Sequence, residues 1–195
     1  MNKTELNKIL KEHKIWLDSD GKEGTRANLS WVNLYRADLY RANLYRANLY
    51  GANLTGADLS KADLRGADLT EANLYGAVLF DADLHGANLY ETNLSGADLR
   101  GVNLTGANLT NAYLSEADLS SADLSEIKGK TIITFSAGKH FAYYCDGHIK
   151  IGCKYMTVEE WSKSYEEIGK SEGYSDEEIK RYARFIMMIM EEESE

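Results

Sequence analysis

The sequence has no proline, only two cysteines and no long apolar run in its 195 residues. With Cys145 and Cys153 alone, no disulfide framework is implied, and a reducing compartment is compatible with the sequence. No stretch approaches the roughly 18 consecutive apolar residues that a membrane span needs. The first residues, MNKTELNKILKEHK, lack the apolar core of a secretory signal. We therefore expect a cytoplasmic protein that has no membrane partner.

Basic residues are also too few to balance the acidic ones, and the formal net charge is −9. Residues 1–25 sum to zero, residues 26–125 to −5 and residues 126–195 to −4. An acidic surface argues against nonspecific binding to phosphate groups. Direct binding to nucleic acid is therefore not expected.

The dominant feature of the sequence is a five-residue repeat of twenty consecutive units, which begins with RANLS at Arg26 and runs to Ser125 without an insertion. The fourth residue of every unit is Leu, and a small residue, usually Ala, lies two positions before it. Asn or Asp lies between them except at Val78 and Tyr113. Such regular repetition indicates one structural unit copied along the chain.

A period of five fits neither an α-helix nor a straight strand, because it would spread the leucines over several sides of either element. The chain must therefore turn at every unit, with Ala and Leu pointing inward, as in a solenoid. Glycine recurs every ten residues at the expected corner, where a positive φ is least costly. We infer that alternate corners differ and that the number of sides is even. These glycines are Gly56, Gly66, Gly76, Gly86, Gly96 and Gly106.

The units, A-(D/N)-L-X-X, resemble those of the pentapeptide-repeat family over about half of the chain. Members of this family fold as right-handed quadrilateral β-helices with four units per coil. The resemblance therefore implies an all-β solenoid of five coils over residues 26–125, about 24 Å long at about 4.8 Å per coil. The family has no shared catalytic residues, so the resemblance implies neither an enzyme nor a cofactor.

Residues 1–25 fit the cap that the open end of a solenoid needs. Thr4 can start a helix that runs through about Leu17, and the turn-rich stretch from Asp18 to Gly24 follows. One side of this helix is apolar and is expected to cover the first coil. Its residues are Leu6, Ile9, Leu10, His13, Trp16 and Leu17.

Residues 126–195 lack the repeat and predict a small α+β domain. Strands are expected at 131–137 and 140–145, and the turn residues Asp146-Gly147 then lead into a strand at 148–156. Ser or Thr with Glu three residues later predicts helices at about 158–169 and 176–192.

The C-terminal pattern GKHFAYY, IKIGC and TVEEW is similar to C-terminal segments of some phage and bacterial pentapeptide-repeat proteins, a likeness that implies no activity. The last helix has more apolar residues than a hairpin alone needs. They allow a homodimer through this domain, although a buried helix in a small domain explains them equally.

Two adjacent faces of the four-sided solenoid are rich in aspartate. Paired carboxylates can serve acid-base catalysis or bind a metal, but a convex rod has no cleft and no histidine cluster joins them. A structural explanation is that Asp and Asn side chains bond to nearby backbone at the turns. One face carries Asp38, Asp58, Asp98 and Asp118 with Asp81 at a corner, and the next carries Asp63, Asp83 and Asp123.

The functional alternative for these faces is DNA mimicry, because characterised pentapeptide-repeat proteins include acidic rods that bind DNA gyrase and protect it from quinolones. Duplex DNA carries one charge per about 1.7 Å, whereas basic residues on the same faces offset much of the charge here. The sequence also lacks a long loop within the rod, and its C-terminal domain differs from the short helical dimer module of those proteins. The basic residues are Arg41, Arg46, Lys61, Arg65 and Arg100.

Residues 26–50 form a basic, aromatic end of the rod, whereas residues 51–125 sum to −8. Arg and Tyr together can bind nucleic acid, but successive units face different sides and make a ring instead of a track. We favour stacking of Arg on Tyr beneath the N-terminal cap.

Val78 breaks the Asp/Asn column, Phe80 follows it on the outside, and Tyr75 lies just before the intervening corner. An apolar cluster that replaces the polar consensus is the best candidate in the sequence for a partner site. Packing against the C-terminal domain or a self-contact is the alternative explanation.

His140, Cys145, His148 and Cys153 offer zinc-type ligands within fourteen residues. A two-residue turn would pair Cys145 with His148 on one face of a hairpin and His140 with Cys153 on the other. A tetrahedral site needs all four to converge, so we expect neither a metal nor a Cys145–Cys153 disulfide. The sequence thus favours a non-enzymatic binding or scaffolding protein whose partner is another protein.

Overall fold

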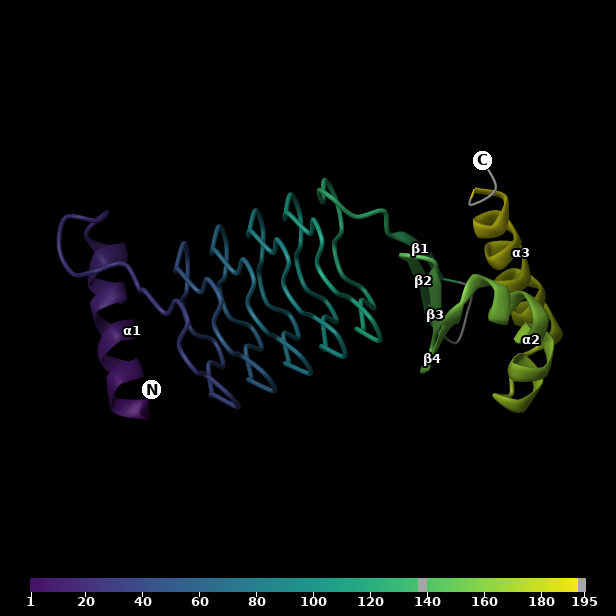
Figure 1. The fold of residues 1–195 in the computed structure, drawn as a ribbon, viewed down its shortest axis with the longest axis horizontal. Helices are drawn as coiled ribbons and strands as arrows, with labels where there is room; N and C mark the ends of the chain where they lie inside the picture. The colour runs from purple at the N-terminus through teal and green to yellow at the C-terminus, as the bar shows by residue number, and fades with distance from the viewer. Residues whose placement is uncertain (137–139, 193–195) are drawn as a thin grey trace. The chain divides into compact units, whose positions relative to one another are not determined.

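The computed structural model describes residues 1–136 and 140–192, and the chain forms two compact units, Met1–Lys130 and Thr131–Glu195 (Figure 1). In the described part of the chain, the first unit contains one helix and the repeats, and the second contains four strands and two helices. Among the described residues, no helix is long and apolar enough to cross a bilayer.

The repeats form a β-helix in which parallel bridges join each third-position residue to the residue twenty positions later. Twenty residues are four units, so each coil has four sides that stack on those of the next coil. Backbone hydrogen bonds hold the coils together, as where the Leu54 N–H donates to the Asn73 carbonyl at 2.7 Å. The bridges continue to Lys128, which lies beyond the last leucine.

We number the four sides of the β-helix by these columns of third-position residues. Face 1 carries Asn28, Asn48, Asp68, Asn88, Asn108 and Lys128; face 2 carries Asn33, Asn53, Asn73, Asn93 and Tyr113; face 3 carries Asp38, Asp58, Val78, Asp98 and Asp118; face 4 carries Asn43, Asp63, Asp83, Asn103 and Asp123.

The core of the β-helix consists of stacked Leu and Ala side chains, as predicted. The leucines from Leu29 to Leu119 are buried, and only Leu124 at the last unit is partly exposed. Thr92 takes the place of an Ala and is also buried, because its hydroxyl donates to the Leu69 carbonyl at 2.7 Å. The core therefore accepts a polar atom where a neighbouring coil supplies the acceptor.

Every corner of the β-helix has the same left-handed backbone conformation. The first residue of each unit from Trp31 to Glu126 has a φ between +52° and +68°, including Arg, Lys and Glu residues. The inference that glycine marks alternate, different corners was therefore wrong. From Trp31 to Gly106 the corner N–H donates to a carbonyl of the next coil, and these hydrogen bonds hold the corners in this conformation at a cost that non-glycine residues bear.

The Asn and Asp side chains close the turns, as the structural explanation predicted. In eighteen units their Oδ1 accepts the N–H of the residue two positions later, which lies just before the corner. The two remaining units are those of Val78 and Tyr113. Asn serves this purpose as well as Asp, so the turn itself requires no charge.

Helix α1 (Lys3–Asp18) precedes the repeats and begins earlier than predicted. Its N-cap is Asn2, whose side chain accepts the Glu5 N–H at 2.9 Å, while the Glu5 carboxylate accepts the Asn2 N–H at 3.0 Å. The assignment of Thr4 as the cap was wrong, because this reciprocal pair satisfies the backbone closer to the chain start.

Helix α1 covers the open end of the first coil through the buried side chain of His13. Its Nδ1 accepts the Ala27 N–H at 3.1 Å, and its ring stacks on Trp16 with centroids 5.6 Å apart. In later units the corresponding N–H donates to the Leu carbonyl of the preceding unit. His13 thus replaces an acceptor that no preceding unit can provide, and the Glu12 carbonyl likewise accepts the Thr25 N–H at 3.2 Å.

The second unit contains an antiparallel sheet in the order β1-β2-β3-β4. Asp146-Gly147 forms the predicted hairpin turn, and Cys145 pairs with His148. Ala137, the predicted end of the first strand, lies outside the described residues. The strands are β1 (Ile133–Ser136), β2 (Phe141–Cys145), β3 (His148–Ile151) and β4 (Lys154–Thr157).

The single predicted strand at 148–156 is two strands in the structure. The chain turns at Gly152 with a φ of +58°, and β4 pairs back on β3 with Ile149 opposite Met156. The prediction was wrong because glycine inside an apolar run marked a second hairpin turn instead of a continuous strand. The pairing of β2 with β3 ends at Ala142 and Ile151, and Cys153 lies in this turn, with the His140 ring beside Gly152.

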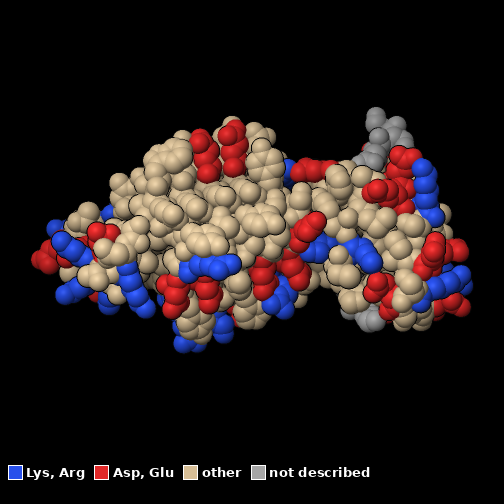
Figure 2. Space-filling view, turned by 60° about the horizontal axis from the view of Figure 1, so that its bottom comes forward, with Lys and Arg blue, Asp and Glu red and all other residues tan. Residues whose placement is uncertain are grey.

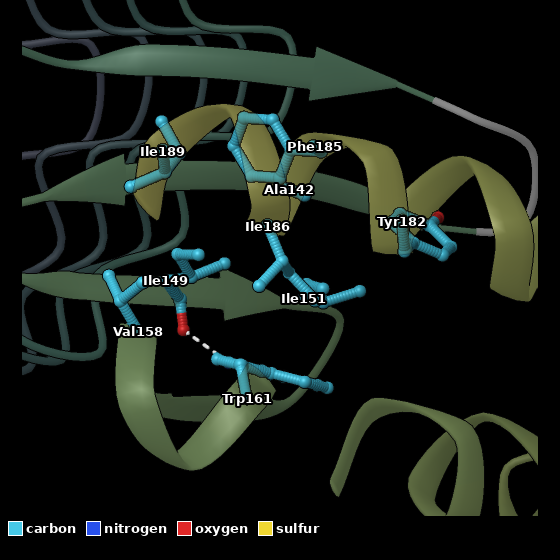
Figure 3. Packing of buried hydrophobic residues seen from close by; sticks show 9 residues of the cluster. All are labelled: Ala142, Ile149, Ile151, Val158, Trp161, Tyr182, Phe185, Ile186 and Ile189. Carbon is cyan, nitrogen blue, oxygen red and sulfur yellow. Dashed lines mark hydrogen bonds between the residues drawn. The ribbon is translucent and has the colours of Figure 1, made fainter. Parts of the chain in front are cut away.

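Helices α2 (Val158–Ser171) and α3 (Asp176–Glu192) begin at the predicted capping residues, Thr157 and Ser175. Their apolar sides pack on Ala142, Ile149 and Ile151 of the sheet (Figure 3). The indole N–H of Trp161 donates to the Ile149 carbonyl at 2.8 Å, which fixes α2 on β3.

Candidate partner surfaces

The predicted aspartates lie in adjoining columns on faces 3 and 4 and at the corner between them. Each column aspartate uses one carboxylate oxygen to close its own turn. Its second oxygen is available to partners or to neighbouring cations. Face 3 carries Asp38, Asp58, Asp98 and Asp118, face 4 carries Asp63, Asp83 and Asp123, and Asp81 lies at the corner.

Arg65 offsets part of the charge on face 4. Its guanidinium contacts Asp63 at 2.7 Å and lies 3.7 Å from Asp83 in the next coil. Burial disfavours ionisation of Asp63, but the hydrogen bonds from Arg65 prevail and lower its pKa. This aspartate therefore stays ionised, with its charge already matched within the chain.

Two of the four face 3 aspartates and the corner aspartate also have cationic partners. The guanidinium of Arg100 contacts Asp98 at 2.6 Å and lies 4.0 Å from Asp118, and its hydrogen bonds lower the pKa of Asp98. Lys61 lies 3.9 Å from Asp81. Acidic and basic side chains accordingly lie side by side over part of the solenoid in Figure 2.

The apolar cluster of Tyr75, Val78 and Phe80 is exposed, with 56%, 37% and 37% of the three residues accessible. We call these three residues the apolar patch. Gly76 lies at the corner between Tyr75 and Val78, and a Cβ added there would meet nothing within 4 Å. Arg100 stacks over the Phe80 ring at 5.5 Å. The patch thus surrounds a bare corner between faces 2 and 3.

The basic end of the rod shows the predicted stacking of arginine on tyrosine. Arg36 lies over Tyr35 at 5.1 Å, and the next two units repeat the arrangement. Because each pair lies on a different face, the arginines form a ring around the first coil. Each guanidinium stacks on a neighbouring tyrosine ring, so the arginines do not form a continuous basic row along which a phosphate backbone could bind.

The corner between faces 1 and 2 was missed by the sequence reasoning. It carries Trp31, which is 66% exposed, and then Glu71 and Glu91 on successive coils. Tyr113, 60% exposed, replaces the polar consensus at the last position of the face 2 column. Aligning the sequence in rows of twenty residues, with attention to the corner position, would have revealed this column.

Among the described residues, no three potential metal ligands come together. Cys145 is buried in β2 opposite His148, whose ring stacks on Tyr155 with centroids 5.0 Å apart. Cys153 is exposed in the turn between β3 and β4. The register thus places Cys145 opposite His148, while the His140 ring lies beside Gly152, the neighbour of Cys153.

Helix α3 exposes Met187, Met188 and Met190, which are 41% to 55% accessible. Met187 and Met190 line a groove of about 470 Å³ between α2 and α3, together with Tyr165. Ile186 also lines this groove and, with Ile189, belongs to the core of the unit. A homodimer through this helix stays a prediction.

A family model described as pentapeptide repeats (8 copies) matches the chain three times, at residues 25–60, 57–96 and 92–128. No curated protein matches the chain significantly.

Solved structures of other pentapeptide-repeat proteins resemble the chain. One from the cyanobacterium Cyanothece 51142 is 32% identical over 62% of this chain and 97% of its own, with a TM-score of 0.41. Another, from Nostoc PCC 7120, is 29% identical over 60% of this chain and 93% of its own, with a TM-score of 0.47. QnrB1, a plasmid-mediated fluoroquinolone resistance protein, is 22% identical over 56% and 69%, with a TM-score of 0.37.

Proposed function

Because the chain belongs to the pentapeptide-repeat family, we propose that it is a non-enzymatic protein whose β-helix offers a rigid surface to another protein. The observation that carries this proposal is the apolar patch, where an exposed apolar group replaces the repeat's own polar residue. Val78 supplies no acceptor for the Phe80 N–H, although eighteen other units have one. A departure that weakens a turn and exposes carbon to water is costly unless a partner covers it.

The rigidity of the β-helix favours binding at this place. Corners and turns are fixed by backbone hydrogen bonds between coils, so the three side chains are presented with little conformational freedom left to lose. The exposed rings of Tyr75 and Phe80 provide aromatic anchors of the kind that dominate protein interfaces. Catalysis has no comparable support, since the carboxylates on faces 3 and 4 lie on convex sides.

Restoring the polar consensus should abolish partner binding and stabilise the protein. In the variant Tyr75→Ser, Val78→Asn, Phe80→Ser, the asparagine introduced at position 78 closes the turn, and we expect Val78→Asn alone to add about 1 kcal/mol to the free energy of unfolding. Affinity capture from lysate with quantitative mass spectrometry should find a stoichiometric partner with the wild type and not with the triple variant. Tyr40→Ser, in the same column as Phe80, is the matched control. Equal capture by wild type and triple variant would contradict the role of the patch.

A second candidate function, a gyrase-directed mimic of DNA, is favoured by the aspartate columns of faces 3 and 4. The ion pairs of Arg65 and Arg100 weaken it, because they reduce the charge that would imitate phosphates. Purified DNA gyrase should be titrated with the protein at two salt concentrations, following supercoiling and direct association. Salt-sensitive inhibition that DNA competes away would support mimicry, and no binding at tens of micromolar would exclude it. We expect no inhibition.

A further inference from the structure

We propose that the corner between faces 1 and 2 is a docking surface for an extended, cationic polypeptide segment, because it combines exposed aromatic rings with carboxylates that no cation among the described residues matches. We call it the aromatic-acidic edge and define it by Trp31, Tyr50, Glu71, Glu91 and Tyr113. The proposal rests on the protein-binding function and adds a second surface with a partner of stated chemistry.

The carboxylates of the edge are arranged differently from those on faces 3 and 4. Glu71 and Glu91 occupy equivalent corners of successive coils, at a spacing of about 4.8 Å, where like charges repel. From residue 48 to residue 113, the described columns on either side of this corner contain no Lys or Arg. The aspartates of faces 3 and 4, in contrast, have Arg65, Arg100 and Lys61 among them.

The aromatic side chains give the edge a defined surface. Trp31 meets Tyr50 edge-on at 5.1 Å and lies directly over Gly51, where a Cβ would come within 2.4 Å of the indole. The Tyr50 hydroxyl donates to Glu71 at 2.8 Å, and this bond raises the pKa of Tyr50. The glutamate is thereby held beside the rings, where a guanidinium or ammonium can contact both a π face and a carboxylate.

The charge and size of the edge select the occupant. A phosphate backbone or an anionic lipid surface would be repelled by Glu71, Glu91 and the nearby Asp68. The four coil steps from Trp31 to Tyr113 span about 19 Å, which matches about six residues of an extended chain. An extended peptide with two or more basic side chains therefore fits the surface better than a compact cation does.

The test is the fluorescence anisotropy of a labelled eight-residue peptide of alternating arginine and serine, titrated with the full chain. The variant Glu71→Gln, Glu91→Gln should bind the peptide at least tenfold more weakly than the wild type, and Trp31→Ser severalfold more weakly. The control variant Asp58→Asn, Asp123→Asn removes the same charge from faces 3 and 4 while keeping both turn acceptors. It should bind within threefold of the wild type.

Three outcomes would overturn the proposal: equal weakening by the control variant, no binding by the wild type up to about 100 μM, or equal binding of a peptide with glutamate in place of arginine. Equal weakening by the control variant would mean that peptide binding depends on the net charge of the protein alone. Thermal unfolding of each variant separates lost binding from lost folding. Because the apolar patch variant leaves the edge intact, failure here and failure of the patch are distinguishable.

Discussion

Replacing Leu74 with Ala should lower the free energy of unfolding of the β-helix by about 3 to 5 kcal/mol. Leu74 is fully buried and lies in the middle of its column, with leucines of adjacent coils on both sides. The variant removes apolar contacts with two coils at once and leaves a cavity that fixed corners cannot close. Differential scanning calorimetry measures the loss.

Leu124→Ala is the matched control for this prediction. Leu124 has the same position in its unit but is already partly exposed, so its truncation should cost only about 1 to 2 kcal/mol. In a repeat protein, stability is nearly a sum of units and their interfaces, which makes a central interruption worse than a terminal one. Similar losses for the two variants would show that the stacking of coils does not carry the stability.

The variant His13→Phe should lower the free energy of unfolding by about 1 to 3 kcal/mol near pH 7.5 and remove a pH dependence of the N-terminal cap. Phe retains an aromatic ring beside Trp16 but leaves the buried Ala27 N–H without its acceptor. His13→Asn is the control, because its amide oxygen can accept this N–H without titrating in the same range.

The pH dependence follows from the burial of His13. Burial lowers the pKa of His13 below 6.5, the Tyr45 backbone opposes this shift, and Arg26 adds to it. The unfolded chain therefore binds a proton more readily than the folded one, so the contribution of His13 is present above pH 6.5 and is lost as the pH falls below that value. Protonation at Nδ1 would also remove the acceptor for Ala27.

Hydrogen exchange at the Ala27 amide measures the opening of the cap. After correction for the intrinsic exchange rate, its protection should fall between pH 7.5 and pH 5 in the wild type and stay constant in His13→Asn. An unchanged protection in the wild type would mean that the neutral ring is not what holds α1 on the first coil.

Much of the β-helix could be predicted, because a period of five requires a turn in every unit with the Ala and Leu side chains inside. The Asn or Asp between them predicts the side-chain hydrogen bond that closes each turn. The conformation of the corners could not be predicted. Residues such as Trp31 and Lys61 disfavour a positive φ on their own, and the hydrogen bonds between coils override that preference. In the second unit, the local sequence pattern predicted one strand through Gly152, but the chain turns there. The turn depends on the pairing of β4 with β3, which the local pattern does not contain.

One of the candidate surfaces could be predicted from the sequence, and the others required the structure. The apolar patch was visible because Val78 departs from a consensus within its own unit. The aromatic-acidic edge required residues twenty positions apart to be compared at the corner, where no consensus had been defined. The partial offset of charge on faces 3 and 4 depends on side-chain geometry, namely the bidentate contacts of Arg65 and Arg100.

Because all corners have the same conformation, the length of an inserted or duplicated segment determines which face each later residue occupies. A duplicated segment of twenty residues would lengthen the rod by one coil and return each later side chain to its own face. A duplicated segment of five residues would preserve the core equally well but turn everything beyond it by one face. Inserted between Tyr75 and Val78, it would move Val78 from face 3 to face 4 and leave Tyr75 on face 2. A partner site can thus be extended, cut or rotated by gene duplication while the fold stays intact.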